Sequence, residues 1–447
     1  MYPWDAGLKS GANIDAFGKS MMRGDAVFVV NSGSSSLKFG VFAGRRVEAR
    51  AEARDKVQAG AKAEVNADVN ADVNALYRGA VEGIGGGEGK IWLRGGTGET
   101  LIEKTKAFPA QKDAARAVAA ELSEMALPAL GAVGHRVVHG GPSLTDHQKI
   151  TPQVLEKLEA AEHFAPLHVP VALELIRETQ QLFPGVAQFA CFDTAFHRTL
   201  PEAAARLPLP EKFWDAGIRR YGFHGLSCES ILHALGPDRP ARVIVAHLGN
   251  GASATAIADG ISVDTSMGLT PTGGIVMGTR PGDLDPGVWL HILRTNGNNV
   301  EGLARLMDKE CGLLGISGTS PDMRSLHAGA GNNQRARLAI EMFARSAKKA
   351  IGSYVAVLGG LDLLVFTGGI GEHDAVVRAG ICDGMECFGL RLDREANQRN
   401  AGTISATDST VLVRVVTSDE ETQIARIVFR LMEDDRSRET AGLALRL

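Results

Sequence analysis

The sequence predicts an α/β protein whose core is built twice. Short apolar runs with strand character alternate along the chain with amphipathic segments of helical period, a pattern typical of α/β layers. A strand, a turn of small residues and a returning strand also occur over residues 26–42 and again over residues 242–257, about 215 residues later. A hairpin repeated at this distance indicates two related halves.

The first hairpin joins the apolar run Ala26–Val30 to the alternating run Leu37–Phe42. We predict that residues 1–24 are an N-terminal extension, because the first convincing strand starts at Ala26. Residues 57–100 contain a four-residue repeat and glycine clusters, and we interpret them as a surface insertion or a frayed helix without assigned chemistry.

The remaining elements follow from apolar periodicity and helix-start signals. In the first half we expect a helix over Lys112–Met125, a strand near Ala132–Val138, a helix capped by Thr151 with Pro152 in its first turn, and a strand over Phe189–Phe192. In the second half we expect strands over Arg242–Ala246, Ala252–Ile257 and Leu361–Phe366, a long helix over Gln334–Leu358 and a closing helix over Glu420–Met432.

Composition argues against several classes of protein. Lys plus Arg number 48 and Asp plus Glu 52, so no basic excess favours nucleic acid or an anionic membrane. The N-terminal residues lack the apolar core of a secretory signal, and the most apolar stretch, Ile351–Ile370, is interpreted as a helix end, a turn and a buried strand. The five cysteines include no C-x-x-C and are expected to be reduced, which predicts a cytoplasmic protein.

Three glycine-rich turns predict a site for phosphate groups. Glycine makes up 53 of the 447 residues. The turns Asn31–Lys38, His247–Gly251 and Gly368–Glu372 are expected to present successive backbone N–H groups to an anion, and the first adds serine hydroxyls and Lys38. Plain tight turns between strands are the alternative. Gly18-Lys19-Ser20 has no strand before it, and no G-x-G-x-x-G stands between a strand and a helix, which disfavours a P-loop or a dinucleotide-binding protein.

Six ordered segments resemble the acetate kinase family: Val30–Lys38, Gly134–Gly141, Phe192–His197, Tyr221–Gly225, His247–Gly251 and Met277–Arg280. The resemblance implies two actin-like (ribonuclease H-like) domains facing a cleft. Residues 25–194 would form the first, with a returning C-terminal helix 421–447, and residues 195–420 would form the nucleotide-binding second. It also implies reversible phosphoryl transfer between ATP and acetate, giving acetyl phosphate and ADP, with Mg²⁺ or Mn²⁺, in a homodimer.

The resemblance implies roles for individual positions. Asp193, His224 and Arg280 match catalytic positions; Arg136, Val138, His168 and Pro271 match substrate-binding positions; Asn31 and Glu420 match magnesium positions. Positions that contact the nucleotide are matched by Lys38, His247, Leu248, Gly249, Asn250, Gly251, Asp322, Met323, Arg324, Gly369, Ile370, Gly371, Glu372 and His373. His135, His139 and His197 are expected to be structural hydrogen-bonding residues.

The chemistry of a carboxylate acceptor explains why arginines are needed. A carboxylate is already ionised at pH 7, so a general base has no proton to remove. Its approach to the γ-phosphoryl group brings like charges together, and two unit charges ~4 Å apart repel by about 4 kcal/mol at an effective dielectric constant of ~20. We therefore expect Arg136 to clamp the carboxylate, and Arg280 and a neutral His224 to stabilise the transferring group. Asp193 then has an orienting or metal-water role.

Other functions stay open at this point. Propionate kinase is the nearest, because one methylene in a pocket changes binding by only ~1–3 kcal/mol. An actin-like ATPase with a partner-binding role would share the phosphate turns but would need no substrate arginine. A sugar kinase would need an aspartate base, which Asp193 could provide, but two arginines favour an anionic acceptor. Val169, Leu226, Cys228 and His373 depart from the family's usual residues, which leaves the nucleotide preference open.

Overall fold

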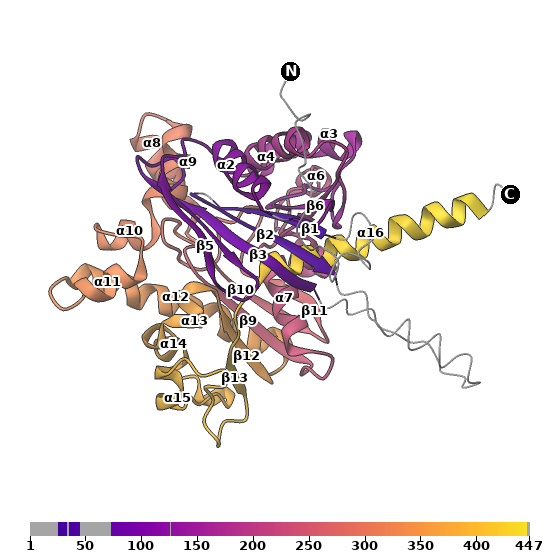
Figure 1. Cartoon of the computed structure of the whole chain (residues 1–447). Helices are drawn as coiled ribbons and strands as arrows, with labels where there is room; N and C mark the ends of the chain where they lie inside the picture. Colours follow the sequence, from indigo (N-terminus) through magenta and orange to yellow (C-terminus); the bar gives the residue numbers. More distant parts are fainter. Residues whose placement is uncertain (1–25, 34, 45–72, 126, 445–447) are drawn as a thin grey trace, which may run out of the picture.

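The computed structural model describes residues 26–33, 35–44, 73–125 and 127–444, which form two β-sheets covered by helices (Figure 1). The predicted extension 1–24 and residues 57–72 of the repeat region lie outside the described residues. The first sheet contains β1 (Ala26–Ser32), β2 (Ser36–Gly44), β3 (Val73–Glu82), β4 (Gly89–Gly95), β5 (Thr100–Lys106), β6 (Leu130–Val137), β7 (Gln148–Lys149) and β8 (Ala187–Phe192). The second contains β9 (Arg242–Leu248), β10 (Ala252–Ala258), β11 (Ile261–Thr265), β12 (Leu363–Thr367) and β13 (Leu412–Val415).

The two sheets share one topology. In the first, the order β3-β2-β1-β6-β8 runs through two antiparallel and then two parallel pairings. In the second, the order β11-β10-β9-β12-β13 repeats this succession of pairings. The predicted hairpins are β1–β2 and β9–β10, the first two strands of each copy. The prediction of an α/β fold with a duplicated core is therefore confirmed.

The interpretation of residues 57–100 as a surface insertion or frayed helix is wrong for the part that is described. Strands β3 and β4 are interior strands of the eight-stranded sheet, and β3 pairs with β2. The glycine clusters lie in the turns after β3 and after β4. Ile91 and Leu93 are buried while Lys90 and Arg94 are exposed. The sequence next to the glycines therefore did contain the alternation of apolar and polar residues that is typical of a strand.

The helices of the first half are α2 (Gln111–Ser123), α3 (Pro152–Ala160), α4 (Val169–Leu182), η1 (Glu162–Phe164) and η2 (Ala195–Thr199). Those that follow are α5 (Glu202–Ala205), α6 (Glu211–Asp215), α7 (Gly225–Leu235), α8 (Pro286–Thr295), α9 (Val300–Arg305), η3 (Leu306–Glu310), α10 (Gly312–Ser317), α11 (Met323–Gly329), α12 (Gln334–Leu358), α13 (Gly368–His373), α14 (Ala375–Cys382), η4 (Glu386–Phe388), α15 (Arg394–Gln398) and α16 (Glu420–Ala444).

Helix boundaries follow the signals read from the sequence. The Thr151 side chain accepts a hydrogen bond from the Val154 N–H, which caps α3 as predicted. The long helix α12 has the predicted bounds. Its first turn is capped by Asn333, and it ends at Gly359, whose left-handed conformation suits a residue without a Cβ. The segment 351–370 is a helix end, a turn and a buried strand, as predicted.

The central strands of each sheet are buried on both faces. Within β1, Phe28 and Val30 face a core that includes α2, whereas Val27 and Val29 face α16. In the second sheet, α12 covers one face of β9 and α7 covers the other. The closing helix α16 is longer than the predicted 420–432 and lies against β1, β2 and β6 of the first sheet (Figure 1). The chain thus returns to the first sheet after completing the second.

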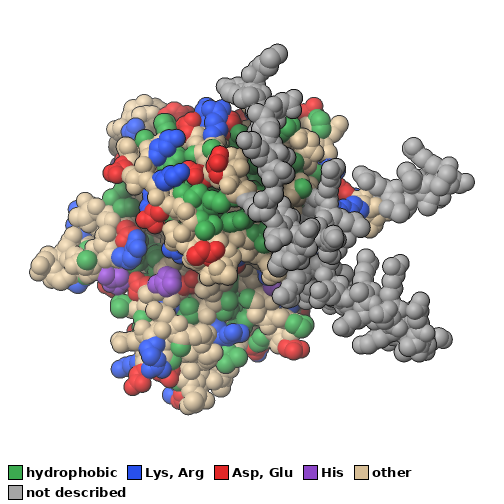
Figure 2. Space-filling model, in the orientation of Figure 1, with side chains coloured by type: hydrophobic (Ala, Val, Ile, Leu, Met, Phe, Trp, Pro, Cys, Tyr) green, Lys and Arg blue, Asp and Glu red, His purple; other side chains and the backbone are tan. Residues whose placement is uncertain are grey.

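The surface of the described residues carries both signs of charge. Acidic and basic side chains are interspersed over the face drawn in the space-filling view (Figure 2). Among the helices of the described residues, none combines the length and apolar character that crossing a bilayer requires.

Candidate active site

A cavity of about 700 Å³ lies where the strand ends of the two sheets meet. Side chains at or just beyond the ends of β1, β6 and β8 line it from the first half, and residues after β9 and β12 line it from the second. Ligand sites in α/β sheets commonly occupy this position. The predicted residues that it brings together are Asn31, Lys38, Arg136, Val138, His168, Asp193, His224, His247, Gly249, Asn250, Gly251, Pro271, Arg280, Gly369, Glu372 and Glu420.

Arg136 and Asp193 form a buried ion pair at the centre of this cavity. Asp193 directly follows β8, and its Oδ2 accepts a 2.6 Å bond from Arg136 Nη2 while its Oδ1 accepts a 3.0 Å bond from Arg136 Nε. Arg136 Nη1 donates to Asn31 Oδ1 at 3.2 Å and lies 3.8 Å from Glu420 Oε2. The predicted clamp for a substrate carboxylate is therefore already bound by a carboxylate of the protein on two of its three nitrogens.

Burial and charge oppose each other in this cluster. Burial lowers the pKa of Arg136, but the carboxylates of Asp193 and Glu420 outweigh it and raise that pKa above its ordinary value. Burial raises the pKa of Asp193, against the lowering effect of Arg136. Burial also acts to raise the pKa of Glu420, but Arg136 and His247 bring it below its ordinary value. Arg136 is therefore the cation that allows two carboxylates to lie in one buried site.

The carboxylates of Glu420 and Glu421 are the best oxygen ligands here for a magnesium ion. Asn31 Nδ2 donates to Glu420 Oε2 at 3.1 Å and to Glu421 Oε1 at 2.6 Å, which aligns the two groups at the cavity wall. Mg²⁺ is commonly held by one or two carboxylates together with substrate phosphates, so this donor set fits it. The Asn31 oxygen is already engaged by Arg136. In the described residues, no group of three or more His, Cys, Asp or Glu side chains could hold a metal.

His224 adopts a backbone conformation that is unusual for a residue with a side chain. Its φ is 58°, in the left-handed region, at the start of α7. Its Nδ1 is 2.9 Å from Ser253 Oγ, and its ring stacks on His247 at 4.2 Å between centroids. Burial, followed by the neighbouring His247 and Arg136, lowers the pKa of His224 well below its ordinary value. The ring is therefore neutral at pH 7, and in the tautomer in which Nδ1 accepts from Ser253, Nε2 carries the proton that it can donate.

Arg280 and His224 converge beside Gly251. A Cβ placed on Gly251 would lie 2.8 Å from Arg280 Nη2 and 3.3 Å from His224 Nε2, so the two donors occupy the space of the missing side chain. Arg280 Nη1 donates to the Pro271 carbonyl at 2.6 Å. Nearby, burial and the charges of Arg280 and Arg136 lower the pKa of His168 to about 4, so this histidine is also neutral at pH 7.

The three predicted phosphate turns differ in structure. The first two are hairpin turns, β1 to β2 and β9 to β10. The third is not: the chain enters the short helix α13 directly after β12. Glu372 Oε1 accepts hydrogen bonds from the Gly368 and Ser418 N–H groups. The carboxylate of this predicted nucleotide contact therefore binds backbone groups of the protein.

Several predicted nucleotide contacts do not line the cavity: Leu248, Asp322, Met323, Arg324, Ile370, Gly371 and His373. Leu248 and Met323 are buried in the core of the second half. Asp322 caps α11 and pairs with Arg324, whose side chain is 93% exposed. Ser32, Gly33, Ser35, Ser36 and Gly368 line the cavity as members of two of the predicted phosphate turns, whereas Phe223, Thr417, Ser418 and Glu421 line it without having been assigned a role. For these four, the one signal in the sequence was that Glu421 is the neighbour of Glu420.

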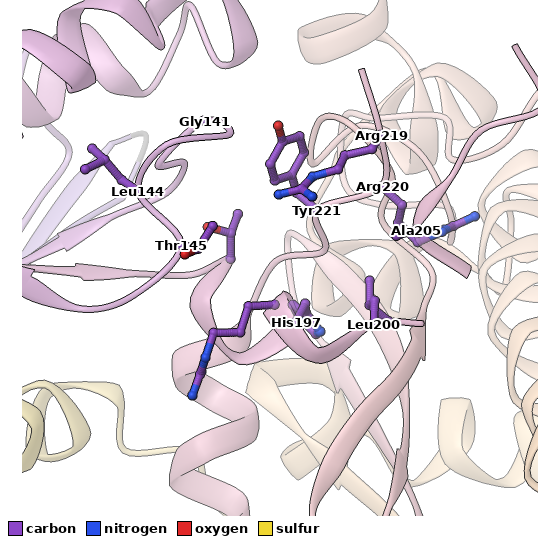
Figure 3. Close-up of a pocket in the computed structure, with 11 residues that line it drawn as sticks. Gly141, Leu144, Thr145, His197, Leu200, Ala205, Arg219, Arg220 and Tyr221 are labelled. Atoms are coloured by element: carbon purple, nitrogen blue, oxygen red, sulfur yellow. The ribbon is translucent and has the colours of Figure 1, made fainter. Parts of the chain in front are cut away.

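The three histidines expected to be structural make hydrogen bonds in the core. His135 lies 2.7 Å from the Gln188 side chain, His139 contacts the Leu269 carbonyl, and His197 lies between Ser262 and the Phe223 carbonyl. Burial lowers the pKa of each to about 4. A separate cavity of about 270 Å³ next to His197 contains none of the predicted site residues, and its Arg219 and Arg220 side chains extend in different directions (Figure 3).

Comparison with known proteins agrees with the duplicated fold and the shared cleft. The profile of the Acetokinase family matches residues 26–426. The propionate kinase of Escherichia fergusonii is 39% identical over 419 residues, 91% of this chain and 96% of that protein. The acetate kinase of Leifsonia xyli is 41% identical over 415 residues, 90% and 97% of the respective chains. The crystal structure of Porphyromonas gingivalis acetate kinase superimposes with a TM-score of 0.75 at 36% identity, over 91% of this chain and 100% of that one.

These likenesses place the protein among the kinases with a duplicated actin-like fold. Within that class, the chain belongs to the Acetokinase family.

Proposed function

We propose that this protein is an acetate kinase, which transfers the γ-phosphoryl group of ATP reversibly to acetate and forms acetyl phosphate and ADP. The observation that supports it best is the convergence of Arg280 Nη2 and His224 Nε2 in the space beside Gly251, with the Arg136–Asp193 pair in the same cavity. A cationic and a neutral donor at one point suit a transferring group whose charge is spread over three oxygens. A hydroxyl acceptor would instead need a free base, and Asp193 is bound by Arg136.

In the proposed step, a carboxylate oxygen of acetate forms a bond to the γ-phosphorus. The bond from that phosphorus to the oxygen bridging the β- and γ-phosphoryl groups breaks, and ADP leaves with the electron pair. No proton moves, because the carboxylate is ionised. Arg280 and His224 stabilise the charge on the transferring group, and Arg136 Nη1 orients the acceptor.

The remaining groups have supporting roles in this proposal. Lys38 and the turns after β1 and β9 bind the nucleotide phosphates. Glu420 and Glu421 would hold Mg²⁺, which would supply positive charge to offset that of the nucleotide phosphates. Val138, Pro271 and Phe223 form the apolar part of the wall where the acceptor methyl group lies.

The test is a panel of acceptors with ATP and Mg²⁺: acetate, propionate, butyrate and glycerol. Acyl phosphate is trapped as the hydroxamate, and ADP is measured separately. We expect acetate to give the highest kcat/KM. A preference for propionate would make the protein a propionate kinase, the name borne by several relatives. ADP release without any acyl phosphate would favour the actin-like ATPase instead and would overturn the proposal.

We further propose that the protein works in the cytoplasm as a homodimer that contacts its second copy through α8 and α9. Helix α8 is largely apolar, yet neither α8 nor α9 buries a residue in the single chain. Leu284, Val288, Leu290 and Val300 are each 40% exposed or more. Exposed apolar side chains gathered on two neighbouring helices favour association with a partner. Light scattering of the purified protein should give twice the chain mass, and Leu290→Glu together with Val300→Glu should shift it to the mass of one chain.

A further inference from the structure

The loop that carries Pro271 and Arg280 is closed by a residue outside it. After Arg280 the chain leaves the site through α8 and α9 and returns through η3, a π-helix over Leu306–Glu310, before α10 begins. Single π-helical turns often occur at functional sites, because they place one residue outside the regular helical register. Asp308 lies in the middle of this π-helix.

Asp308 binds both arms of the loop. Its Oδ1 accepts a 2.8 Å hydrogen bond from Thr272 Oγ1, and its backbone oxygen accepts a 2.7 Å bond from Thr279 Oγ1. Thr272 follows Pro271 and Thr279 precedes Arg280. Because Arg280 Nη1 donates to the Pro271 carbonyl, the bonds form a closed circuit from Asp308 through both arms and the guanidinium group.

The backbone around this circuit is bonded to the same returning segment. The Cys311 N–H donates to the Thr279 carbonyl at 3.1 Å, and the Leu313 N–H donates to the Met277 carbonyl at 2.9 Å. These bonds fix the arm that ends in Arg280. The arm that starts at Pro271 is joined to the returning segment through a side chain, because Thr272 Oγ1 donates to the Asp308 carboxylate, while Gly274 further along is bonded to Asp283.

Charge gives a second link between Asp308 and Arg280. Burial lowers the pKa of Arg280, and Asp308 is the acidic group that opposes this effect, while Arg136 adds to it. In the described part of the chain, Arg280 forms no ion pair, so its guanidinium group stays available to an anion in the cavity. Asp308 thus lies close enough to stabilise the charged form of Arg280, but it does not form an ion pair with the guanidinium group.

We infer that Asp308 is a positioning residue that aims Arg280 and Pro271 into the cavity through its bond to Thr272. This inference rests on the proposed function, since it assigns the support of a group that acts on the transferring phosphoryl. A displacement of about 1 Å at such a group can cost on the order of 100-fold in rate. Asp308 itself lies outside the cavity lining.

The experiment compares Asp308→Ala, Thr272→Val and the double variant with the full-length protein. Each single variant should lose about 10- to 100-fold in kcat with acetate, while the KM for ATP changes less than about threefold. The double variant should be no worse than the more damaged single one, because the two residues act as one unit. Asp308→Asn keeps an acceptor for Thr272 and should restore kcat to within about threefold of the wild type.

Asp285→Ala is the matched control. Asp285 is an acidic residue of the segment between Arg280 and α10, and its side chain caps α8 and does not bind Thr272 or Thr279. Its kcat should equal that of the wild type. Hydrogen–deuterium exchange gives a readout that does not depend on activity: residues 272–276, on the arm that the Asp308 carboxylate holds, should exchange faster in Asp308→Ala and Thr272→Val, but not in Asp308→Asn or Asp285→Ala.

The outcomes separate the two proposals. A wild-type protein that forms no acyl phosphate overturns the proposed function, and exchange then decides on Asp308 alone. Unchanged exchange over residues 272–276 in Asp308→Ala overturns the inference. If the wild type is active, the inference is also overturned when Asp308→Ala and Thr272→Val have the wild-type kcat. It is likewise overturned when the losses in kcat of the two single variants multiply in the double variant.

Discussion

Arg136 reaches the cleft with most of its guanidinium group bound to Asp193, through three contacts of 2.6 to 3.1 Å. Nη1, which faces Asn31, is the nitrogen left toward the remainder of the site. Bidentate pairing of this kind fixes the plane of the guanidinium group. Asp193 therefore orients the arginine, and this agrees with its expected role better than proton abstraction does.

Asp193→Asn should lower kcat by about 10²- to 10³-fold and raise the KM for acetate, because an amide cannot fix Arg136 in the same plane or balance its charge. The measurement is steady-state kinetics with both substrates varied. Asp362→Asn is the matched control, since Asp362 also binds an arginine, Arg242, but at the starts of β9 and β12, the strand ends opposite the cavity. A variant Asp193→Asn with wild-type kcat would contradict the orienting role.

Arg280→Ala should lose about 10³-fold or more in the rate of acyl phosphate formation while it still binds ATP. The reason is that Arg280 is proposed to stabilise the transferring group, whereas Lys38 and the backbone N–H groups of the turns after β1 and β9 are proposed to bind the nucleotide phosphates. Isothermal titration with a non-hydrolysable ATP analogue measures the binding. Full activity in this variant would refute the argument that two anions need cations to meet.

Gly251→Ala should reduce kcat by about 10-fold or more without unfolding the protein, because the added Cβ meets Arg280 Nη2 at 2.8 Å and displaces it. Gly329→Ala serves as the control, because a Cβ there meets no atom within 4 Å. Circular dichroism checks the fold of both variants. If Gly251→Ala keeps its kcat, the space beside this glycine is not where the transferring group is bound.

The buried histidines should make the protein less stable in acid. The pKa of His135 is about 4 in the folded protein against an ordinary value of 6.5, so unfolding takes up a proton between these values. The free energy of unfolding should therefore fall as the pH drops from 6.5 to 4, by up to about 1.4 kcal/mol per pH unit for each such histidine. Urea unfolding at several pH values measures the slope, and His135→Gln should make it shallower. An equal slope in the variant would contradict this origin.

Local patterns predicted the parts of the fold that local forces determine. The two hairpins, the cap at Thr151 and the whole of α12 were readable because alternation, capping residues and helical period act within a few positions. Strands β3 and β4 were missed because the glycines of their turns and the adjacent repeat obscured a short alternation. The parallel pairing of β1 with β6 joins residues about 100 positions apart, and no local signal records it.

In the site, too, the residues themselves could be predicted, but the contacts between residues far apart in the sequence could not. Resemblance placed Arg136, Asp193, His224 and Arg280 in one cavity, where the structure also has them. It did not predict that Arg136 is bound by Asp193, because that contact joins residues 57 positions apart on neighbouring strands. Nor did it predict Asp308, whose contact with Thr272 spans 36 positions and depends on a π-helical turn.

The place of α16 has a consequence for the order of events during biosynthesis. Asn31 lies on β1, yet its carboxylate partners Glu420 and Glu421 are about 390 positions later, on the helix that covers one face of the first sheet. A ribosome must translate almost the whole message before that face is shielded and before Asn31 can meet its two carboxylate partners. Until then the nascent chain exposes a hydrophobic surface around Val27 and Val29. We therefore expect chaperones to bind the nascent chain at this surface.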